Sequence, residues 1–141
     1  MAERDPDCIF CKIIAGEIPS SRIYEDEMVL AFMDVNPLAG GHVLVIPKGH
    51  YPRATDIDAE SMAAVGAVLP RLSRAVMAAT GADGFNLYQT NGRCAGQSVD
   101  HVHVHIIPRM PGDGLGINWN SAKYAEGDLE AWHGKIVDAL E

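Results

Sequence analysis

The spacing of apolar residues predicts two helices, one in the middle of the chain and one at its C-terminal end. Between Asp58 and Thr80 they recur at intervals of three and four, which is the period of one helix face. Asp58 is a typical N-cap and Gly81 a typical helix stop, so we expect a long helix between them. A shorter pattern of the same period predicts an amphipathic helix from Asp128 to Leu140.

Runs of β-branched and apolar residues bounded by turn residues predict five strands. They are expected at Arg22 to Glu25, Met28 to Met33, His42 to Ile46, Gly84 to Thr90 and His101 to Arg109. Gly40 and Gly41 precede the third strand, which indicates that the backbone there passes close to another segment. A short helix is predicted from Cys8 to Ala15 and ends at Gly16.

Length and charge narrow the classes of function. The 141 residues, 48% of them apolar and 21% charged, fit one globular domain over residues 1–141. The net charge of -8 argues against binding to a nucleic-acid backbone or an anionic membrane, because both would repel the chain. The first residues resemble no secretion signal, and no run approaches eighteen apolar residues, so we expect a cytoplasmic protein.

The chain has three cysteines, and two of them form a pair. An odd count without a secretion signal disfavours a disulfide framework. Cys8 and Cys11 have the C-x-x-C spacing of zinc sites, of redox pairs, and of two small buried side chains on adjacent helical turns. A tetrahedral zinc site would need two further ligands, and Cys94 stands alone.

Three histidines alternate with apolar residues in the last predicted strand. In a strand His101, His103 and His105 share one face, while the intervening valines face the core. At about 3.3 Å per residue the outer two lie roughly 13 Å apart, so one metal ion would hold all three only under strain. A neutral imidazole is well suited to attack phosphorus and form a covalent intermediate, which favours nucleophilic chemistry.

The segment His101-Val-His-Val-His-Ile-Ile107 resembles the signature of the histidine triad family, in which three histidines alternate with apolar residues. Other segments that resemble the family lie at Ile9 to Ile14, Glu17 to Pro19, Ala31 to Asp34, Gly41 to Pro47 and Gly96 to Ser98. The resemblance covers a core of residues 8–109 and leaves residues 110–141 as a C-terminal extension. It implies an α+β fold, with about five antiparallel strands and the long helix across one face, and a homodimer with a continuous sheet.

The resemblance also implies roles for individual residues. His103 would be the nucleophile that attacks the α-phosphorus of a nucleotide, and His105 and His42 would support it and stabilise charge on phosphoryl oxygens. Groups near the leaving group and phosphate would be Gln97, Ser98 and Asn91. Asp34 would accept hydrogen bonds from the ribose hydroxyls, and the base slot would be formed by Phe10, Ile13, Ile18, Phe32 and Val35.

Some bacterial members of the family resemble this chain at the cysteine pair. By that resemblance His50 and His101 would complete a structural Cys2His2 zinc site with Cys8 and Cys11. This assignment also removes the spacing problem, because His101 then binds the metal while His103 and His105 remain free for phosphate. A redox function of the cysteine pair is the alternative.

The resemblance implies a hydrolase that releases a purine nucleoside monophosphate from a phosphoramidate or an acyl nucleotide. Gly96-Gln-Ser98 is similar to the phosphoramidase branch, whereas Ile107-Pro108-Arg109 is similar to members that hydrolyse dinucleoside polyphosphates. Dinucleoside polyphosphate hydrolysis is therefore the second interpretation. A non-enzymatic protein that binds nucleotides or an interaction partner is the third.

Overall fold

The computed structural model describes residues 1–116 and 120–141, so three residues of the C-terminal extension lie outside the described residues. The elements are α1 (Ile9–Ile14), β1 (Arg22–Glu25), β2 (Val29–Met33), β3 (Val43–Pro47), α2 (Ala59–Thr80), β4 (Gly84–Tyr88), the 3-10 turn η1 (Arg93–Ala95), β5 (Val104–Arg109) and α3 (Asp128–Ala139). The five strands form one antiparallel sheet in the order β1-β2-β3-β5-β4. This confirms the predicted α+β class.

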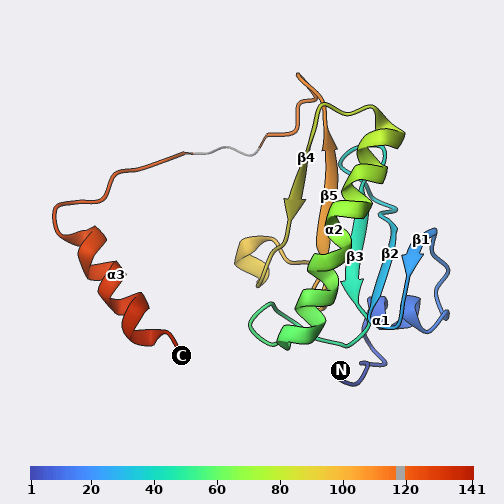
Figure 1. Cartoon of the computed structure of the whole chain (residues 1–141), viewed down its shortest axis with the longest axis horizontal. Helices are drawn as coiled ribbons and strands as arrows, with labels where there is room; N and C mark the ends of the chain where they lie inside the picture. The colour runs from blue at the N-terminus through green and yellow to red at the C-terminus, as the bar shows by residue number, and fades with distance from the viewer. Residues whose placement is uncertain (117–119) are drawn as a thin grey trace.

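Each face of the sheet is covered by a different helix, with α2 on one face and α1 on the other (Figure 1). Successive side chains of the central strands point to opposite faces of the sheet, as in any β-strand. Val29, Ala31, Val43 and Val45 pack with Val65, Leu72 and Val76 of α2. Leu30, Phe32, Leu44 and Ile46 pack with Phe10, Ile13 and Ile14 of α1. The sheet is thus apolar on both sides, and α1 borders the histidines.

The long helix has the predicted ends. The side chain of Asp58 accepts a hydrogen bond from the backbone N–H of Ser61, and Gly81 ends the helix in the left-handed conformation. By length and composition α2 would be able to cross a membrane, but a core helix passes the same test. Val65, Leu72 and Val76 of α2 are buried against the sheet, so one face of this helix packs in the core.

The strand that carries the histidines is shorter than predicted. Pairing with β3 begins at Val104, so His101 and His103 precede β5 instead of forming part of it. The reason is that the N–H of Val102 donates to the carbonyl of Tyr51, outside the ladder. Smaller differences are that β2 begins at Val29 and β4 ends at Tyr88.

Gly41 occupies the close backbone approach predicted before the third strand. Its φ is +94°, and a Cβ there would overlap Cγ2 of Thr80 at the end of α2. Both the positive φ and the contact exclude a side chain. The neighbouring Gly40 has no positive φ and no atom within 4 Å of an added Cβ.

We therefore expect Gly41→Ala to lower the free energy of unfolding by about 2–3 kcal/mol, from backbone strain plus overlap with Thr80. Gly40→Ala is the matched control and should change it by less than about 0.5 kcal/mol. Urea unfolding of the two variants measures the difference. Equal effects of the two substitutions would contradict the close approach.

Candidate active site

A cavity of about 370 Å³ opens between α1, the chain that follows β2, and the start of β5. It brings together nine of the residues predicted to form the site, namely Phe10, Ile13, Ile18, Phe32, Asp34, Val35, Ser98, His103 and His105. Its α1 side is apolar, while Asp34 and the two histidines supply polar groups. The cavity thus combines an apolar slot with chemistry at one end, as small-molecule sites do.

One ring nitrogen of His103 is committed to a backbone hydrogen bond. Its Nδ1 lies 2.7 Å from the carbonyl oxygen of His101, and only a protonated nitrogen can donate to that carbonyl. Nε2 of the neutral ring therefore keeps its lone pair. Burial lowers the pKa of His103 below its usual value, which favours this neutral form. The ring of Phe10 packs edge-on against His103, with 5.1 Å between ring centroids.

His42 and His105 are joined by a hydrogen bond with a definite direction. The N–H of Leu38 donates to Nδ1 of His42, so the proton of a neutral His42 ring lies on Nε2. Nε2 is 2.8 Å from Nδ1 of His105 and donates to it. His105 consequently carries its own proton on Nε2. The rings of His105 and His103 are adjacent, with centroids 4.9 Å apart.

The same neighbours keep these histidines uncharged. Burial, with the nearby His103 and His42 rings, lowers the pKa of His105 to about 4. Burial also lowers the pKa of His42, and the carboxylate of Asp34 opposes this shift. Oδ2 of Asp34 lies 3.5 Å from Nε2 of His42, while Oδ1 accepts from the N–H of Asn36. The site is thus a set of neutral imidazoles bordered by one carboxylate.

Three residues predicted for the nucleotide site do not line the cavity: His42, which is hydrogen-bonded to His105, and the amides Gln97 and Asn91. The side chain of Gln97 is buried and fully used, because Oε1 accepts from the N–H of Gly92 while Nε2 donates to the carbonyls of Pro52 and Val99. The Asn91 side chain pairs with Gln89 and accepts from the N–H of Ala54. Both amides therefore hold the loop that leads to the histidines, and of this loop Ser98 reaches the cavity.

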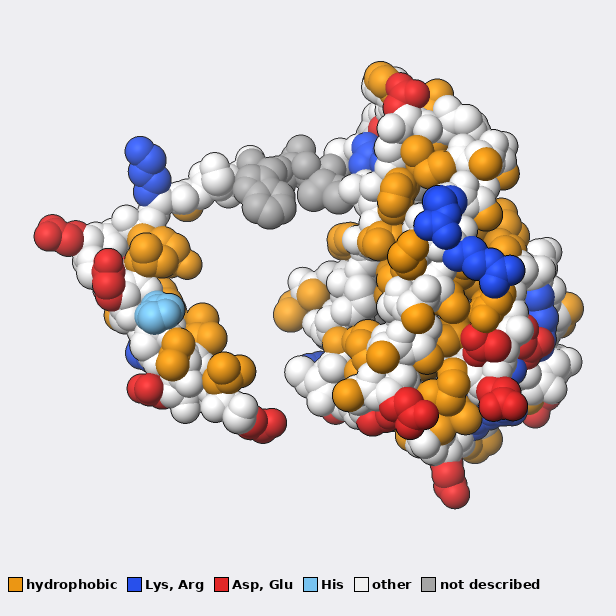
Figure 2. Space-filling model, in the orientation of Figure 1, with side chains coloured by type: hydrophobic (Ala, Val, Ile, Leu, Met, Phe, Trp, Pro, Cys, Tyr) orange, Lys and Arg blue, Asp and Glu red, His pale blue; other side chains and the backbone are white. Residues whose placement is uncertain are grey.

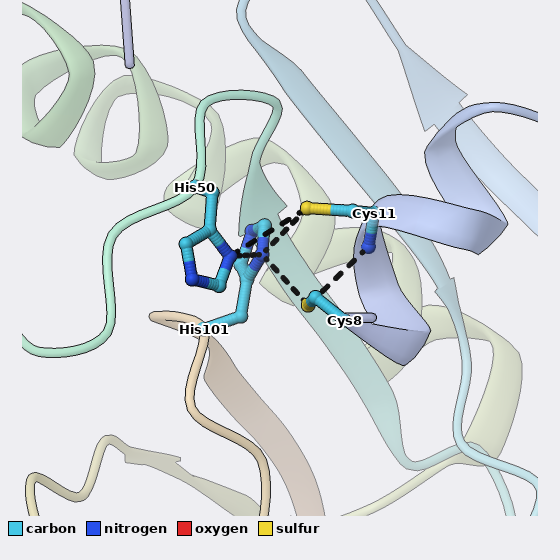
Figure 3. A group of neighbouring side chains, drawn as sticks. All are labelled: Cys8, Cys11, His50 and His101. Carbon is cyan, nitrogen blue, oxygen red and sulfur yellow. Dashed lines mark hydrogen bonds between the residues drawn. The ribbon is translucent and has the colours of Figure 1, made fainter. Parts of the chain in front are cut away.

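Next to the cavity, the four predicted metal ligands meet in one cluster (Figure 3). Nδ1 of His101 lies 3.5 Å from Sγ of Cys8, 3.6 Å from Sγ of Cys11 and 3.3 Å from Nδ1 of His50. Tetrahedral Zn²⁺, with bonds of about 2.3 Å to sulfur and about 2.0 Å to nitrogen, separates its ligands by about 3.3 Å (N to N) and about 3.5 Å (N to S). The observed spacings match this tetrahedron.

The surroundings of the cluster also suit a cation. Nε2 of His101 donates to the carbonyl of Pro47 at 2.8 Å, which leaves Nδ1 free to bind a metal. Burial raises the pKa of the Cys11 thiol to about 11, so a nearby positive charge is needed to stabilise the thiolate. A Zn²⁺ ion would supply that charge, and the donor set of two sulfurs and two imidazoles fits it.

A second cluster, of Asp34, His42 and His105, has less suitable chemistry for a metal. The bond from Leu38 to Nδ1 of His42 places a proton on the nitrogen that faces the other two groups. A metal there would have to displace that proton. Three backbone groups determine which nitrogen of these histidines carries the proton: the Leu38 N–H and the carbonyls of His101 and Pro47. The sequence does not reveal them, because a backbone group is the same whatever its side chain.

The lowered histidine pKa predicts a loss of stability in acid. An unfolded histidine binds a proton below pH about 6.5, whereas folded His105 does so only near pH 4, so unfolding is favoured between these values. His105→Gln removes this group. Between pH 7 and 4.5 the free energy of unfolding of the variant should therefore fall by about 1–3 kcal/mol less than that of the wild type.

Urea titrations at the two pH values measure this difference. Thr55→Ser, at an exposed residue that does not titrate, is the control and should fall as the wild type does. An equal fall for His105→Gln and the wild type would show that His105 is not held neutral by folding.

Known proteins resemble this chain in sequence. The HIT domain family model matches residues 15–112. An adenylylsulfatase of Arabidopsis thaliana is 50% identical over 109 residues, which are 77% of this chain and 55% of that protein, so the chain spans about half of that relative. An adenosine 5′-monophosphoramidase of Schizosaccharomyces pombe is 40% identical over 95% of this chain and 98% of that protein.

Solved structures agree with the architecture. A Streptococcus mutans protein, 41% identical, superposes with a TM-score of 0.94 over 100% of this chain and 90% of its own. A zinc-bound histidine triad family protein of Mycobacterium smegmatis, 38% identical, superposes with a TM-score of 0.74 over 95% of this chain and 98% of its own. With the family model matching well over half of its residues and the sheet order and histidines in place, the chain belongs to the HIT, or histidine triad, family.

Proposed function

We propose that this protein hydrolyses nucleotides by attack of His103 on the α-phosphorus, releasing a purine nucleoside monophosphate from a phosphoramidate or an acyl nucleotide. The observation that carries the proposal is the hydrogen bond from Nδ1 of His103 to the carbonyl of His101, which leaves Nε2 as a free nucleophile at the cavity. The phosphoramidase and adenylylsulfatase names of its relatives support this class of substrate.

In the proposed reaction Nε2 of His103 forms a bond to phosphorus while the bond from phosphorus to the leaving group breaks. Water then attacks the nucleotidyl-histidine, which returns His103 and releases the monophosphate. His105 would stabilise charge on the phosphoryl oxygens through its Nε2–H, and His42 would hold that ring by the 2.8 Å hydrogen bond. The nucleoside would lie along α1, with Asp34 at the ribose and apolar side chains around the base.

His103→Ala should reduce AMP release from adenosine 5′-phosphoramidate by about 1000-fold or more, because it removes the nucleophile. Glu60→Gln, at an exposed residue in the first turn of α2 and outside the cavity lining, should retain full activity. The assay is repeated with a diadenosine polyphosphate. Turnover of that substrate alone would favour a dinucleoside polyphosphate hydrolase. Absence of both activities would favour a non-enzymatic binding protein. An active His103→Ala variant would exclude His103 as the nucleophile.

We also propose that Cys8, Cys11, His50 and His101 hold a structural Zn²⁺ ion. The tetrahedral spacing of their donor atoms supports this, as does the zinc-bound relative. The ion would fix the N-terminal end of α1 to the chain that follows β3 and to the segment that precedes β5. Cys8 and Cys11 lie at that end of α1, and His50 and His101 lie in the other two segments. Its contribution would be structural, since all four ligands are supplied by the protein.

Elemental analysis should therefore find close to one zinc per chain, and Cys11→Ser should lose the metal and unfold at a lower temperature. Cys94→Ser replaces an exposed thiol outside the cluster and is the matched control, expected to keep both metal and stability. His103→Ala should also retain zinc. Less than about a tenth of an ion per chain, with Cys11→Ser as stable as the control, would contradict the site.

We propose, further, that the protein forms a homodimer through β4, which is an edge strand of the sheet. Phe85 and Leu87 of β4 are exposed, and an apolar groove of about 620 Å³ separates them from Leu69 and Met77 of α2. An edge with free backbone groups beside an apolar groove favours pairing with a second copy of itself. Such pairing would extend the sheet across both subunits.

A further inference from the structure

The C-terminal helix α3 has an apolar face that no other described residue of its own chain covers. Leu129, Trp132, Ile136 and Leu140 recur at helical spacing, and each is more than half exposed. No residue of α3 is buried. Figure 2 shows these apolar side chains gathered on the side of the helix that is turned toward the body of the molecule, with acidic side chains on the outer side.

Such a helix is not expected to be stable by itself. It has twelve residues, and its N-terminus at Gly127 lacks a side-chain cap. Isolated helices of this length are marginal in water, and most helical stability in proteins comes from packing an apolar face. The apolar face of α3 therefore requires a surface to cover it.

The direction in which the chain leaves the body is fixed. The guanidinium of Arg109 donates to both carboxylate oxygens of Asp113, at 2.7 and 2.9 Å, and also to the carbonyl of Leu115. It is itself held by Oδ1 of Asn86 on β4 at 2.8 Å. These bonds anchor the extension to β4 and β5, and beyond them α3 lies apart from the body on the β4 side (Figure 1).

The placement of α3 is shared with a solved relative. The superposition on the Streptococcus mutans structure has a TM-score of 0.94 and includes all of this chain, so it includes α3. The body also leaves Phe85 and Leu87 exposed on the side toward α3, beside the apolar groove over α2. The helix α3 lies away from its own body and on the side of β4, where a second copy is proposed to pair. That copy is therefore the partner that α3 is placed to meet.

We infer that α3 packs its apolar face on a second copy of this chain, so that the two subunits exchange their C-terminal helices. The inference rests on the proposed homodimer, which it deepens. By the two-fold symmetry of such a dimer each subunit gives one helix and receives one, and both apolar faces are buried. The acidic side of α3 stays in solvent.

Cross-linking between isotopically distinct chains tests the exchange. A benzophenone amino acid in place of Ile136 labels the apolar face of α3, and chains with ¹⁴N and ¹⁵N are mixed, allowed to exchange subunits and irradiated. Sedimentation measures the dimer fraction, and AMP release is assayed on the same sample. We expect cross-links from α3 to the body of a chain with the other isotope, in about half of the cross-linked peptides for an equal mixture.

A pair of double variants gives a second measurement. Trp132→Ser with Ile136→Ser removes the apolar face and should raise the dimer dissociation constant at least about 10-fold. Glu130→Ser with Asp138→Ser changes exposed acidic residues of the same helix and should leave the dissociation constant within about two-fold. The body fold, monitored by zinc content, should be the same in both.

The other outcomes each overturn the exchange. Cross-links only within chains of one isotope would show that α3 packs on its own body. A dimer without cross-links from α3 would mean that β4 alone forms the interface. A monomer that still releases AMP would refute the dimer and the exchange but keep the hydrolase, whereas exchanged helices without AMP release would refute the hydrolase alone.

Discussion

The hydrogen bond from Nδ1 of His103 to the carbonyl of His101 is the constraint on which the reactive site depends. It assigns the proton of the ring to Nδ1 and thereby leaves the lone pair on Nε2, as the proposed nucleophile requires. The carbonyl can fulfil this function only if His101 is fixed. His101 is fixed twice, by the Pro47 carbonyl at Nε2 and by the Cys8 and Cys11 side chains around Nδ1.

The proposed metal site and the proposed catalytic site are consequently linked through His101, which belongs to the first and orients the second. Three histidines of similar sequence context have three different surroundings. The cysteine pair and His50 surround His101, Phe10 packs on His103, and His42 and Tyr88 lie beside His105. Phe10 contributes to both parts, since its ring packs on His101 and on His103. A structural ion at one end would thus hold the segment whose backbone orients the nucleophile. This arrangement buries several neutral imidazoles, so acid destabilises the fold by favouring their protonation in the unfolded chain.

Much of this arrangement was predictable from the sequence. Strong periodicity located α2 and its caps at Asp58 and Gly81, and Gly41 indicated the close approach to Thr80. The histidine spacing indicated the reactive segment, and the resemblance to the histidine triad family supplied His50 and His101 as partners of the cysteine pair. The structure brings both groups together. The start of β5 was placed too early, because the bond from Val102 to Tyr51 joins segments far apart in sequence. The positions of Gln97 and Asn91 in the loop were likewise set by long-range contacts with the segment from Pro52 to Ala54.

The central claim is that His103 becomes covalently bound to the nucleotide. Rapid mixing with adenosine 5′-phosphoramidate, quenching in cold alkali to preserve the phosphorus–nitrogen bond, and peptide mass spectrometry test it directly. The account predicts one adenylyl group, located on His103, whose amount rises before the steady state. An adenylyl group on another residue, or none during continued AMP release, would contradict it.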